Sequence, residues 1–207
     1  RPEKVKDKGS AAITGAKGLY FINADGADKN KSTQIWTQGE TEGSSCWFPT
    51  IDAPNQKTTQ EIYITVPNKF VTLSNGSLVN QTNNGNLRTD YWKMDQKHAP
   101  YLFFMGVGEF EIVKDSYKNI PVNYYVEKEY AQYAKDIFGN TPEMIQFFSE
   151  KLGVAYPWNK YSQIVVRDYV SGAMENTTAV VHGEQAYQTP GQLIDENTHE
   201  NTIAHEL

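Results

Sequence analysis

The first half of the chain alternates apolar and polar residues in short runs. Across Leu19–Val107 these runs are separated by Asn, Gly, Pro and Asp, a pattern typical of antiparallel sheet with one buried face. Asn75–Gly76 and Asn84–Gly85 each predict a tight hairpin between neighbouring runs. The expected architecture is a β-meander that forms part of a sandwich or saddle.

The spacing of apolar residues changes in the second half. Two more strand-like runs, Phe110–Val113 and Val122–Val126, lead into Tyr130–Phe138, where apolar residues recur at three- and four-residue steps as on a helix. We therefore expect an α+β chain, with a β domain in residues 1–108 and the beginning of an α+β domain in residues 109–207.

A better-marked helix begins at Thr141. Thr141 can cap it, Pro142 suits its first turn, and Gly153 can close it in a left-handed conformation. Tyr161–Val166 then predicts a buried strand. A last helix is expected over Glu196–Leu207 and should continue in the natural protein.

Composition and charge exclude several classes of partner. The 207 residues are 39% hydrophobic and 13% aromatic, which is enough to build a core. A net charge of -6, from 19 Lys and Arg against 25 Asp and Glu, provides no basic stripe for phosphates, so no nucleic-acid partner is expected. The longest apolar run, Tyr101–Val107, is far shorter than the roughly 20 residues of a membrane-spanning helix, so no transmembrane segment is expected.

Cysteine content and the chain ends say little about compartment. Cys46 is the single cysteine, which excludes an internal disulfide, and we expect it to be buried beside Trp47. The chain opens at Arg1 without an apolar signal core, and we expect both ends to be cut from a longer protein. Localisation stays open, although Asn-, Thr- and Tyr-rich segments slightly favour an exported or periplasmic protein.

The pair His-Glu occurs twice near the end, at His199–Glu200 and His205–Glu206. In the metallopeptidase signature His-Glu-x-x-His, two histidines four apart leave one face of a helix and bind one zinc ion. Ile203, which cannot bind zinc, stands four residues after His199, whereas four residues after His205 is position 209, outside the sequence. The two histidines are about 240° apart around a helix, so they do not chelate one ion together.

The other candidate residues are ambiguous when read singly. His98 and His182 lie in or near strand-like runs without a suitable partner, and we interpret them as ordinary surface or hydrogen-bonded histidines. Thr37–Glu40, followed by Asp52–Pro54, is most simply a loop with rigid prolines.

Read together, three ordered motifs resemble the zinc aminopeptidases of the gluzincin clan, the family of the alanyl aminopeptidases and the leukotriene hydrolase. The motifs are Gln38–Glu40 with the proline-bounded Asp52–Pro54, the Gly-Ala-Met-Glu-Asn run at Gly172–Asn176, and His205–Glu206. That family places Gly-x-Met-Glu-Asn some thirty residues before its zinc signature, and here 205 minus 175 is 30. The resemblance implies the later part of an N-terminal β domain in residues 1–108 and the beginning of a thermolysin-like catalytic domain in residues 109–207, truncated within the zinc-binding helix.

The resemblance implies how a peptide with a free N-terminus would be gripped. Glu175 and Glu40 would hold its ammonium group by charge-assisted hydrogen bonds. Backbone groups of Gly172 and Ala173 would align the peptide as an added strand, and Met174 would offer a soft wall to the first side chain.

The resemblance also implies zinc chemistry. His205 would be a zinc ligand, and Glu206 would be the base that takes a proton from zinc-bound water. The family's second histidine, distal glutamate ligand and transition-state tyrosine would lie in the missing C-terminal remainder of the protein. Because one histidine cannot hold zinc firmly, we expect the 207-residue chain to bind zinc weakly or not at all and to be inactive.

Two alternatives remain open. One is a non-catalytic β-rich peptide-binding module that keeps the amine-gripping strand but has lost the metal site. The other is zinc hydrolase chemistry on a non-peptide substrate. The sequence does not show the preference for the first substrate residue or the oligomeric state.

Overall fold

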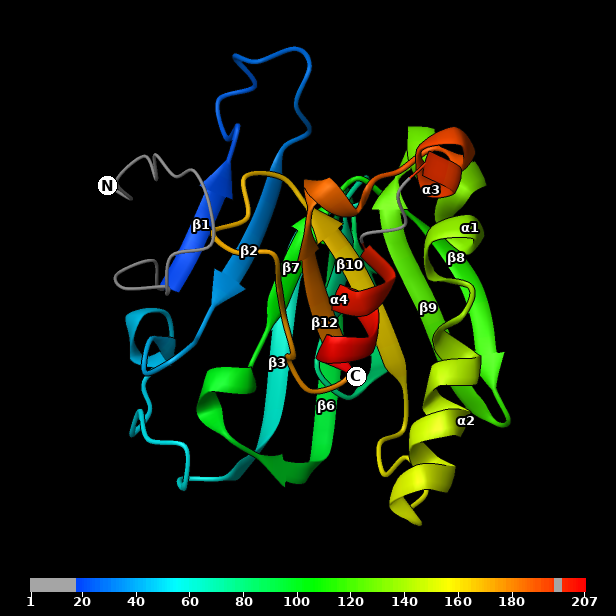
Figure 1. The fold of residues 1–207 in the computed structure, drawn as a ribbon. Helices are drawn as coiled ribbons and strands as arrows, with labels where there is room; N and C mark the ends of the chain where they lie inside the picture. Colours follow the sequence, from blue (N-terminus) through cyan, green and yellow to red (C-terminus); the bar gives the residue numbers. More distant parts are fainter. Residues whose placement is uncertain (1–17, 196–198) are drawn as a thin grey trace. The chain divides into compact units, whose positions relative to one another are not determined.

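The computed structural model describes residues 18–195 and 199–207 (Figure 1). The chain divides into two compact units between Glu109 and Phe110. Within the described ranges, no helix is both long enough and apolar enough to cross a membrane.

The first unit consists of two antiparallel sheets. The four-stranded sheet has the order β1-β2-β7-β4, with bounds Gly18–Ile22, Gln34–Gln38, Met105–Gly108 and Val71–Ser74. The three-stranded sheet has the order β3-β6-β5, with bounds Thr58–Pro67, Leu87–His98 and Ser77–Asn84. The connections include the 3₁₀ turns η1 and η2, at Ser44–Cys46 and Pro100–Leu102.

The strand order corrects the predicted meander. The hairpin at Asn84–Gly85 is confirmed, because β5 pairs with β6 across a turn in which Gly85 has a φ of 60°. Asn75–Gly76 is not a hairpin, because β4 before it and β5 after it belong to different sheets. Gly76 has a φ of 72°, and a Cβ there would lie 1.9 Å from the carbonyl oxygen of Lys93. A glycine is therefore required where the chain passes between the sheets.

A buried polar network joins the two sheets. The Thr72 hydroxyl of β4 donates to Asp90 of β6 at 2.6 Å and accepts from the Trp92 indole N–H at 2.9 Å. Arg88 donates to both oxygens of Asp90, at 2.6 and 2.9 Å. Burial alone would raise the pKa of Asp90, but hydrogen bonds from Arg88, Thr72 and Gln81 bring it below its ordinary value. The carboxylate is thus buried as a charged and fully partnered group.

His98, the last residue of β6, is buried without such partners. Its side chain is 3% exposed, and neither ring nitrogen has a hydrogen-bond partner among the residues that the structure describes. The ring stacks on Phe103, with centroids 4.4 Å apart. Burial lowers the pKa of His98 to about 4, so the neutral imidazole occupies the site at the cost of two unpaired nitrogens.

The substitution His98→Phe should make the chain less sensitive to acid. The pKa of His98 is about 6.5 in the unfolded chain and about 4 in the folded one, so protonation of the unfolded state lowers stability as the pH falls between these values. The phenyl ring keeps the stacking on Phe103 and does not titrate. Thermal unfolding of both proteins at about pH 7 and about pH 5 should show a smaller loss for the variant. An equal loss in both would contradict this account of His98.

The second unit is built on one five-stranded sheet. Its order is β11-β12-β10-β9-β8, with bounds Ala173–Met174, Ala179–Gly183, Tyr161–Val166, Ile120–Glu127 and Phe110–Tyr117. β10 is parallel to β9 and to β12, whereas both outer pairs are antiparallel. The described helical segments are η3 (Lys128–Tyr133), α1 (Ala134–Phe138), α2 (Thr141–Leu152), η4 (Glu184–Ala186), α3 (Pro190–Asp195) and α4 (His199–Glu206).

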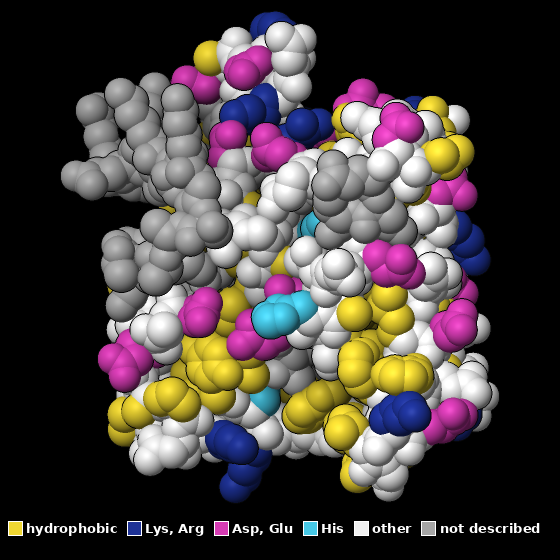
Figure 2. All heavy atoms as spheres, viewed as in Figure 1, with side chains coloured by type: hydrophobic (Ala, Val, Ile, Leu, Met, Phe, Trp, Pro, Cys, Tyr) yellow, Lys and Arg dark blue, Asp and Glu magenta, His cyan; other side chains and the backbone are white. Residues whose placement is uncertain are grey.

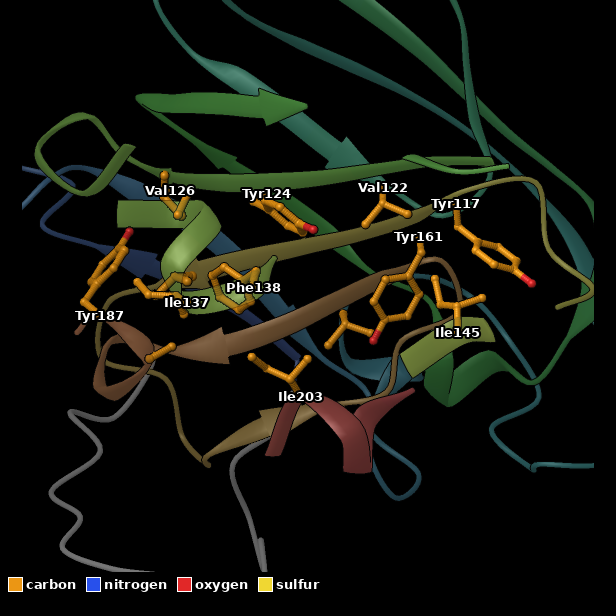
Figure 3. Close-up of a cluster of buried hydrophobic side chains, with 14 residues drawn as sticks. Tyr117, Val122, Tyr124, Val126, Ile137, Phe138, Ile145, Tyr161, Tyr187 and Ile203 are labelled. Atoms are coloured by element: carbon orange, nitrogen blue, oxygen red, sulfur yellow. The ribbon is translucent and has the colours of Figure 1, made fainter. Parts of the chain in front are cut away.

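The core of the second unit lies between this sheet and its helices (Figure 3). Every residue of β10 and β12 is buried, as expected for central parallel strands covered on both faces. Phe138 of α1, Ile145 of α2 and Ile203 of α4 pack into the same cluster. Ile203 therefore fixes one face of α4 against the core.

The predicted α+β class is confirmed, and several local predictions can be checked. α2 has the predicted bounds, and Gly153 closes it with a φ of 66°. Thr141 is not its cap: Asn140 occupies the N-cap position, and the Thr141 hydroxyl donates to the carbonyl oxygen of Phe138 at 2.6 Å. The hydroxyl is turned into the core because Gln163 also binds it there.

Two further predictions are changed or limited. The predicted last helix appears as α4, while residues 196–198 of that prediction lie outside the described ranges. Cys46 is exposed rather than buried, because Ser44 is the residue of η1 that points inward.

Apolar side chains also reach solvent around α2 in the second unit, among them Phe147 and Leu152 (Figure 2).

Candidate active site

The Gly-Ala-Met-Glu-Asn run forms the outermost strand of the five-stranded sheet. β11 is antiparallel to β12, with Ala173 opposite His182. The Gly183 N–H donates to the Gly172 carbonyl oxygen at 2.9 Å, which makes Ala173 and His182 a non-hydrogen-bonded pair. The N–H and C=O of Ala173 therefore point away from β12. No described strand pairs with this outer edge, and its geometry suits an added peptide strand.

The side chains of this run point in different directions. Met174 is buried, whereas Glu175, directly after the strand, is exposed. The Asn176 carbonyl accepts the Ala179 N–H at 2.9 Å and closes the turn into β12. Thr178 in this turn has a φ of 64°. The turn therefore leaves the Glu175 carboxylate open to solvent beside the free strand edge.

The turn after β12 holds the segment that enters β11. The Gln185 side-chain amide donates to the Gly172 carbonyl oxygen at 3.0 Å. The Glu184 carboxylate accepts the N–H of Asp168, a residue with a φ of 54°. A Cβ on Gly183 would lie 2.3 Å from the Gln185 side-chain oxygen, so the glycine allows Gln185 to fold back. The sequence motifs did not reveal these supporting contacts.

The substitution Gln185→Leu should loosen the entry to β11. It removes one neutral hydrogen bond, about 1 kcal/mol, and should speed amide hydrogen exchange in residues 168–174 about fivefold. Gln192→Leu is the matched control, because Gln192 accepts the N–H of Thr189 elsewhere in the unit and should leave this segment unchanged. Unaltered exchange in the Gln185 variant would show that this contact does not order the strand.

His205 and Glu206 share the last turn of α4, a helix that contacts β11. The His205 side chain is exposed, while Glu206 is only 9% exposed. Burial raises the pKa of the Tyr161 phenol, and electrostatic interactions with Tyr156 and Glu206 raise it further. The buried Glu206 carboxylate therefore lies within electrostatic range of Tyr161 in β10. The structure brings α4 and β11 into contact within the second unit.

These residues fit zinc as part of a ligand set. Imidazole is a preferred zinc ligand, and the exposed ring of His205 is available for this purpose. In residues 18–195 and 199–207, no three His, Cys, Asp or Glu side chains are grouped so as to hold a metal ion. Because a catalytic zinc normally takes three protein ligands, the described residues supply one donor rather than a complete site.

Glu40 lies just after β2 in the first unit and is half-buried. Gly39 before it packs so closely that a Cβ would lie 2.4 Å from the carbonyl oxygen of Tyr101. The Gly43 N–H donates to the Gly39 carbonyl at 2.7 Å and closes the loop. Only glycine fits at position 39, so the loop that carries Glu40 has a defined start.

The Asp52–Pro54 motif supports the same loop. One Asp52 oxygen accepts both the backbone N–H and the hydroxyl of Ser45, each at 2.9 Å. The neighbouring Ser44 hydroxyl donates to the Pro100 carbonyl at 2.7 Å. Asp52 thus acts on the loop of Glu40 through Ser45. Glu40 belongs to the first unit and Glu175 to the second.

The first His-Glu pair also has hydrogen-bond partners. His199 Nε2 lies 3.1 Å from His182 Nδ1, and His182 Nε2 lies 2.9 Å from the Gln163 side-chain oxygen. The Glu200 carboxylate accepts from the Asn140 side-chain amide at 2.7 Å. His182 is hydrogen-bonded, as predicted.

Two family models match this chain. The Peptidase M1 N-terminal domain matches residues 12–102, and the Peptidase family M1 domain matches residues 137–207. The chain belongs to peptidase family M1. The match to the M1 N-terminal domain contains Glu40, and the match to the M1 peptidase domain contains β11 and α4.

Relatives in family M1 extend this assignment. Aminopeptidase M1 of Arabidopsis thaliana is 30% identical over 171 residues, covering 82% of this chain and 19% of the relative. Tricorn protease-interacting factor F2 of Thermoplasma volcanium is 28% identical over 194 residues, covering 92% and 24%. Puromycin-sensitive aminopeptidase of Caenorhabditis elegans is 28% identical over 174 residues, covering 80% and 18%. This M1 chain therefore spans about a fifth of the length of these curated relatives.

Proposed function

We propose that this chain is part of a zinc-dependent aminopeptidase that removes N-terminal residues from peptides. Residues 1–108 contribute the later part of its N-terminal β domain, and residues 109–207 contribute the beginning of a thermolysin-like catalytic domain. The observation that carries this proposal is the contact of α4, the helix of His205 and Glu206, with β11, whose outer edge pairs with no described strand. Relatives named as aminopeptidases support the same reaction.

Substrate binding in the complete enzyme follows from the strand edge. The outward N–H and C=O of Ala173 pair with an extended peptide, and Gly172 leaves room for its backbone. Glu175 and Glu40 hold the α-ammonium group by charge-assisted hydrogen bonds. Met174 borders the space for the first side chain. An exopeptidase needs such an anchor because it must measure one residue from the free amine.

The chemistry resides at the end of α4. His205 supplies one zinc ligand, and the rest of the protein supplies the others. When bound, zinc would supply Lewis-acid polarisation of the scissile carbonyl and a lowered pKa of the attacking water. Glu206, the next residue on the helix, accepts a proton from the attacking water and delivers it to the departing amine.

The 207-residue chain by itself should bind zinc weakly and hydrolyse no aminoacyl amide. The described residues provide one imidazole at the proposed site, whereas firm binding takes three ligands. Zinc content after gel filtration, with His205→Ala as the control, measures this. A tightly held, near-stoichiometric zinc that disappears in the His205 variant would contradict the prediction.

In the complete enzyme, Glu175→Gln and Glu40→Gln should each lower kcat/KM. Either change removes a charge partner of the ammonium group, worth roughly 1.5–3 kcal/mol or about ten- to a hundredfold. Glu42→Gln, an exposed residue of the Glu40 loop, is the matched control and should change little. If both variants cleave N-terminal residues at the parent rate, the anchoring role is wrong.

A non-catalytic peptide-binding module is the second candidate. The open edge at Ala173 and the exposed Glu175 favour it, because neither requires a metal to bind an extended peptide. This alternative predicts a complete protein that binds peptides with a free amino terminus but holds no zinc. Zinc content of the complete protein separates the two candidates.

A further inference from the structure

A continuous chain of buried hydrogen bonds connects α1 to the first turn of α4. The Thr141 hydroxyl donates to the Phe138 carbonyl at 2.6 Å, and the Gln163 amide nitrogen donates to Thr141 at 2.9 Å. The Gln163 oxygen lies 2.9 Å from His182 Nε2, and His182 Nδ1 lies 3.1 Å from His199 Nε2. The path thus runs from a helix, through β10 and β12, to the helix that carries His205 and Glu206.

The direction of every bond in this path is determined. A carbonyl only accepts, so Thr141 donates to Phe138 and can only accept from Gln163. The Gln163 oxygen therefore faces His182, which must carry its proton on Nε2. The bare Nδ1 of neutral His182 then accepts the Nε2–H of His199. All partners are consistent with two neutral imidazoles.

Burial reinforces this arrangement. His182 is 0% exposed and His199 is 5% exposed. Burial lowers the pKa of His199 to about 4, and burial with the neighbouring His199 holds the pKa of His182 well below its ordinary value. Both rings stay neutral in ordinary buffers. An unpaired donor or acceptor at this depth would be costly, so the bond between the rings has a strong orienting effect.

Three contacts at different positions determine the placement of α4. His199 binds the sheet, and Glu200 on the next position binds Asn140 between α1 and α2. Ile203, one turn further, packs into the core. Two polar anchors and one apolar anchor restrict both the rotation of α4 about its axis and its sliding along that axis. His205 follows two residues after Ile203 on the same turn.

We propose that His182 and His199 are positioning residues that fix the rotation and depth of α4, and thereby hold His205 ready to bind zinc. The zinc part of this inference rests on the proposed function. His199–Glu200 has no second zinc ligand four residues after its histidine. This pair instead anchors the helix that carries His205 and Glu206.

The test uses the complete enzyme with His199→Phe and His199→Gln. Phenylalanine keeps the ring volume but cannot donate to His182. The amide nitrogen of glutamine stands near the position of His199 Nε2 and can donate. His98→Phe is the matched control, because it replaces another buried histidine in the first unit. Gln163→Leu breaks the path on the sheet side and serves if His199→Phe does not fold.

Two quantities are measured: amide hydrogen exchange of residues 199–206 in zinc-free protein, and zinc affinity by chelator competition. In His199→Phe or Gln163→Leu, exchange should rise and zinc affinity should fall, each about tenfold. His199→Gln should restore both most of the way, and His98→Phe should leave both at the parent value. Zinc affinity should fall without a change in KM once zinc is saturating.

Parent-like exchange in both His199→Phe and Gln163→Leu overturns the proposal. It is also overturned if His199→Gln behaves like His199→Phe, because the hydrogen bond would then not be the cause. If the parent enzyme binds no zinc, the proposed function fails, whereas faster exchange in His199→Phe would still support the anchoring of α4.

Discussion

The docking of α4 onto the sheet is the interaction on which the candidate active site depends. Ile203 packs into the core, and His199 completes a hydrogen-bond path through His182 to Gln163. Most of the stability of a helix in a protein comes from tertiary packing, and these contacts supply it for α4. Because the same helix carries His205 and Glu206, their placement beside β11 is a consequence of packing rather than of helix propensity.

The open edge of β11 provides the second half of this site. A short edge strand normally risks pairing with another chain, and here its entry is restrained by Gln185 and Glu184. Gly183 allows Gln185 to approach closely, because a Cβ there would lie 2.3 Å from the Gln185 side-chain oxygen. The result is an ordered strand whose outward backbone groups, those of Ala173, can pair with a peptide. In the first unit, Gly39 and Asp52 restrain the Glu40 loop in a comparable way.

Local chemistry explains which features could be predicted from the sequence. The turns at Gly153 and at Asn84–Gly85 were predictable, because the positive φ that each turn requires is a local property of the glycine. Asn75–Gly76 has the same local sequence pattern, but its glycine is needed because the chain passes close to Lys93 there. Which strands pair is determined by the whole fold rather than by this dipeptide. Thr141 has the chemistry of a cap, yet a partner 22 residues away binds its hydroxyl in the core.

The candidate site also contains features that the local sequence predicts and features that it does not. Ordered motifs identified β11, the Glu40 loop and the end of α4, while the roles of Glu40, Gly172, Ala173, Met174, Glu175, His205 and Glu206 stay predictions. Gln185, Gln163 and the pairing of His182 with His199 could not be found, because hydrogen bonds between distant segments leave no periodic pattern. Cys46 was predicted to be buried but is exposed, because the conformation of the 3₁₀ turn η1 places Ser44 inward instead.

The most direct measurement of the central claim is the natural coding sequence beyond position 207, read for about forty codons. A histidine at position 209 and a glutamate some twenty residues later would complete three zinc ligands with His205, as the proposed aminopeptidase requires. A residue at position 209 that cannot bind a metal would contradict that proposal. His205 would then be an ordinary exposed helix residue, and the open edge of β11 would favour the peptide-binding module.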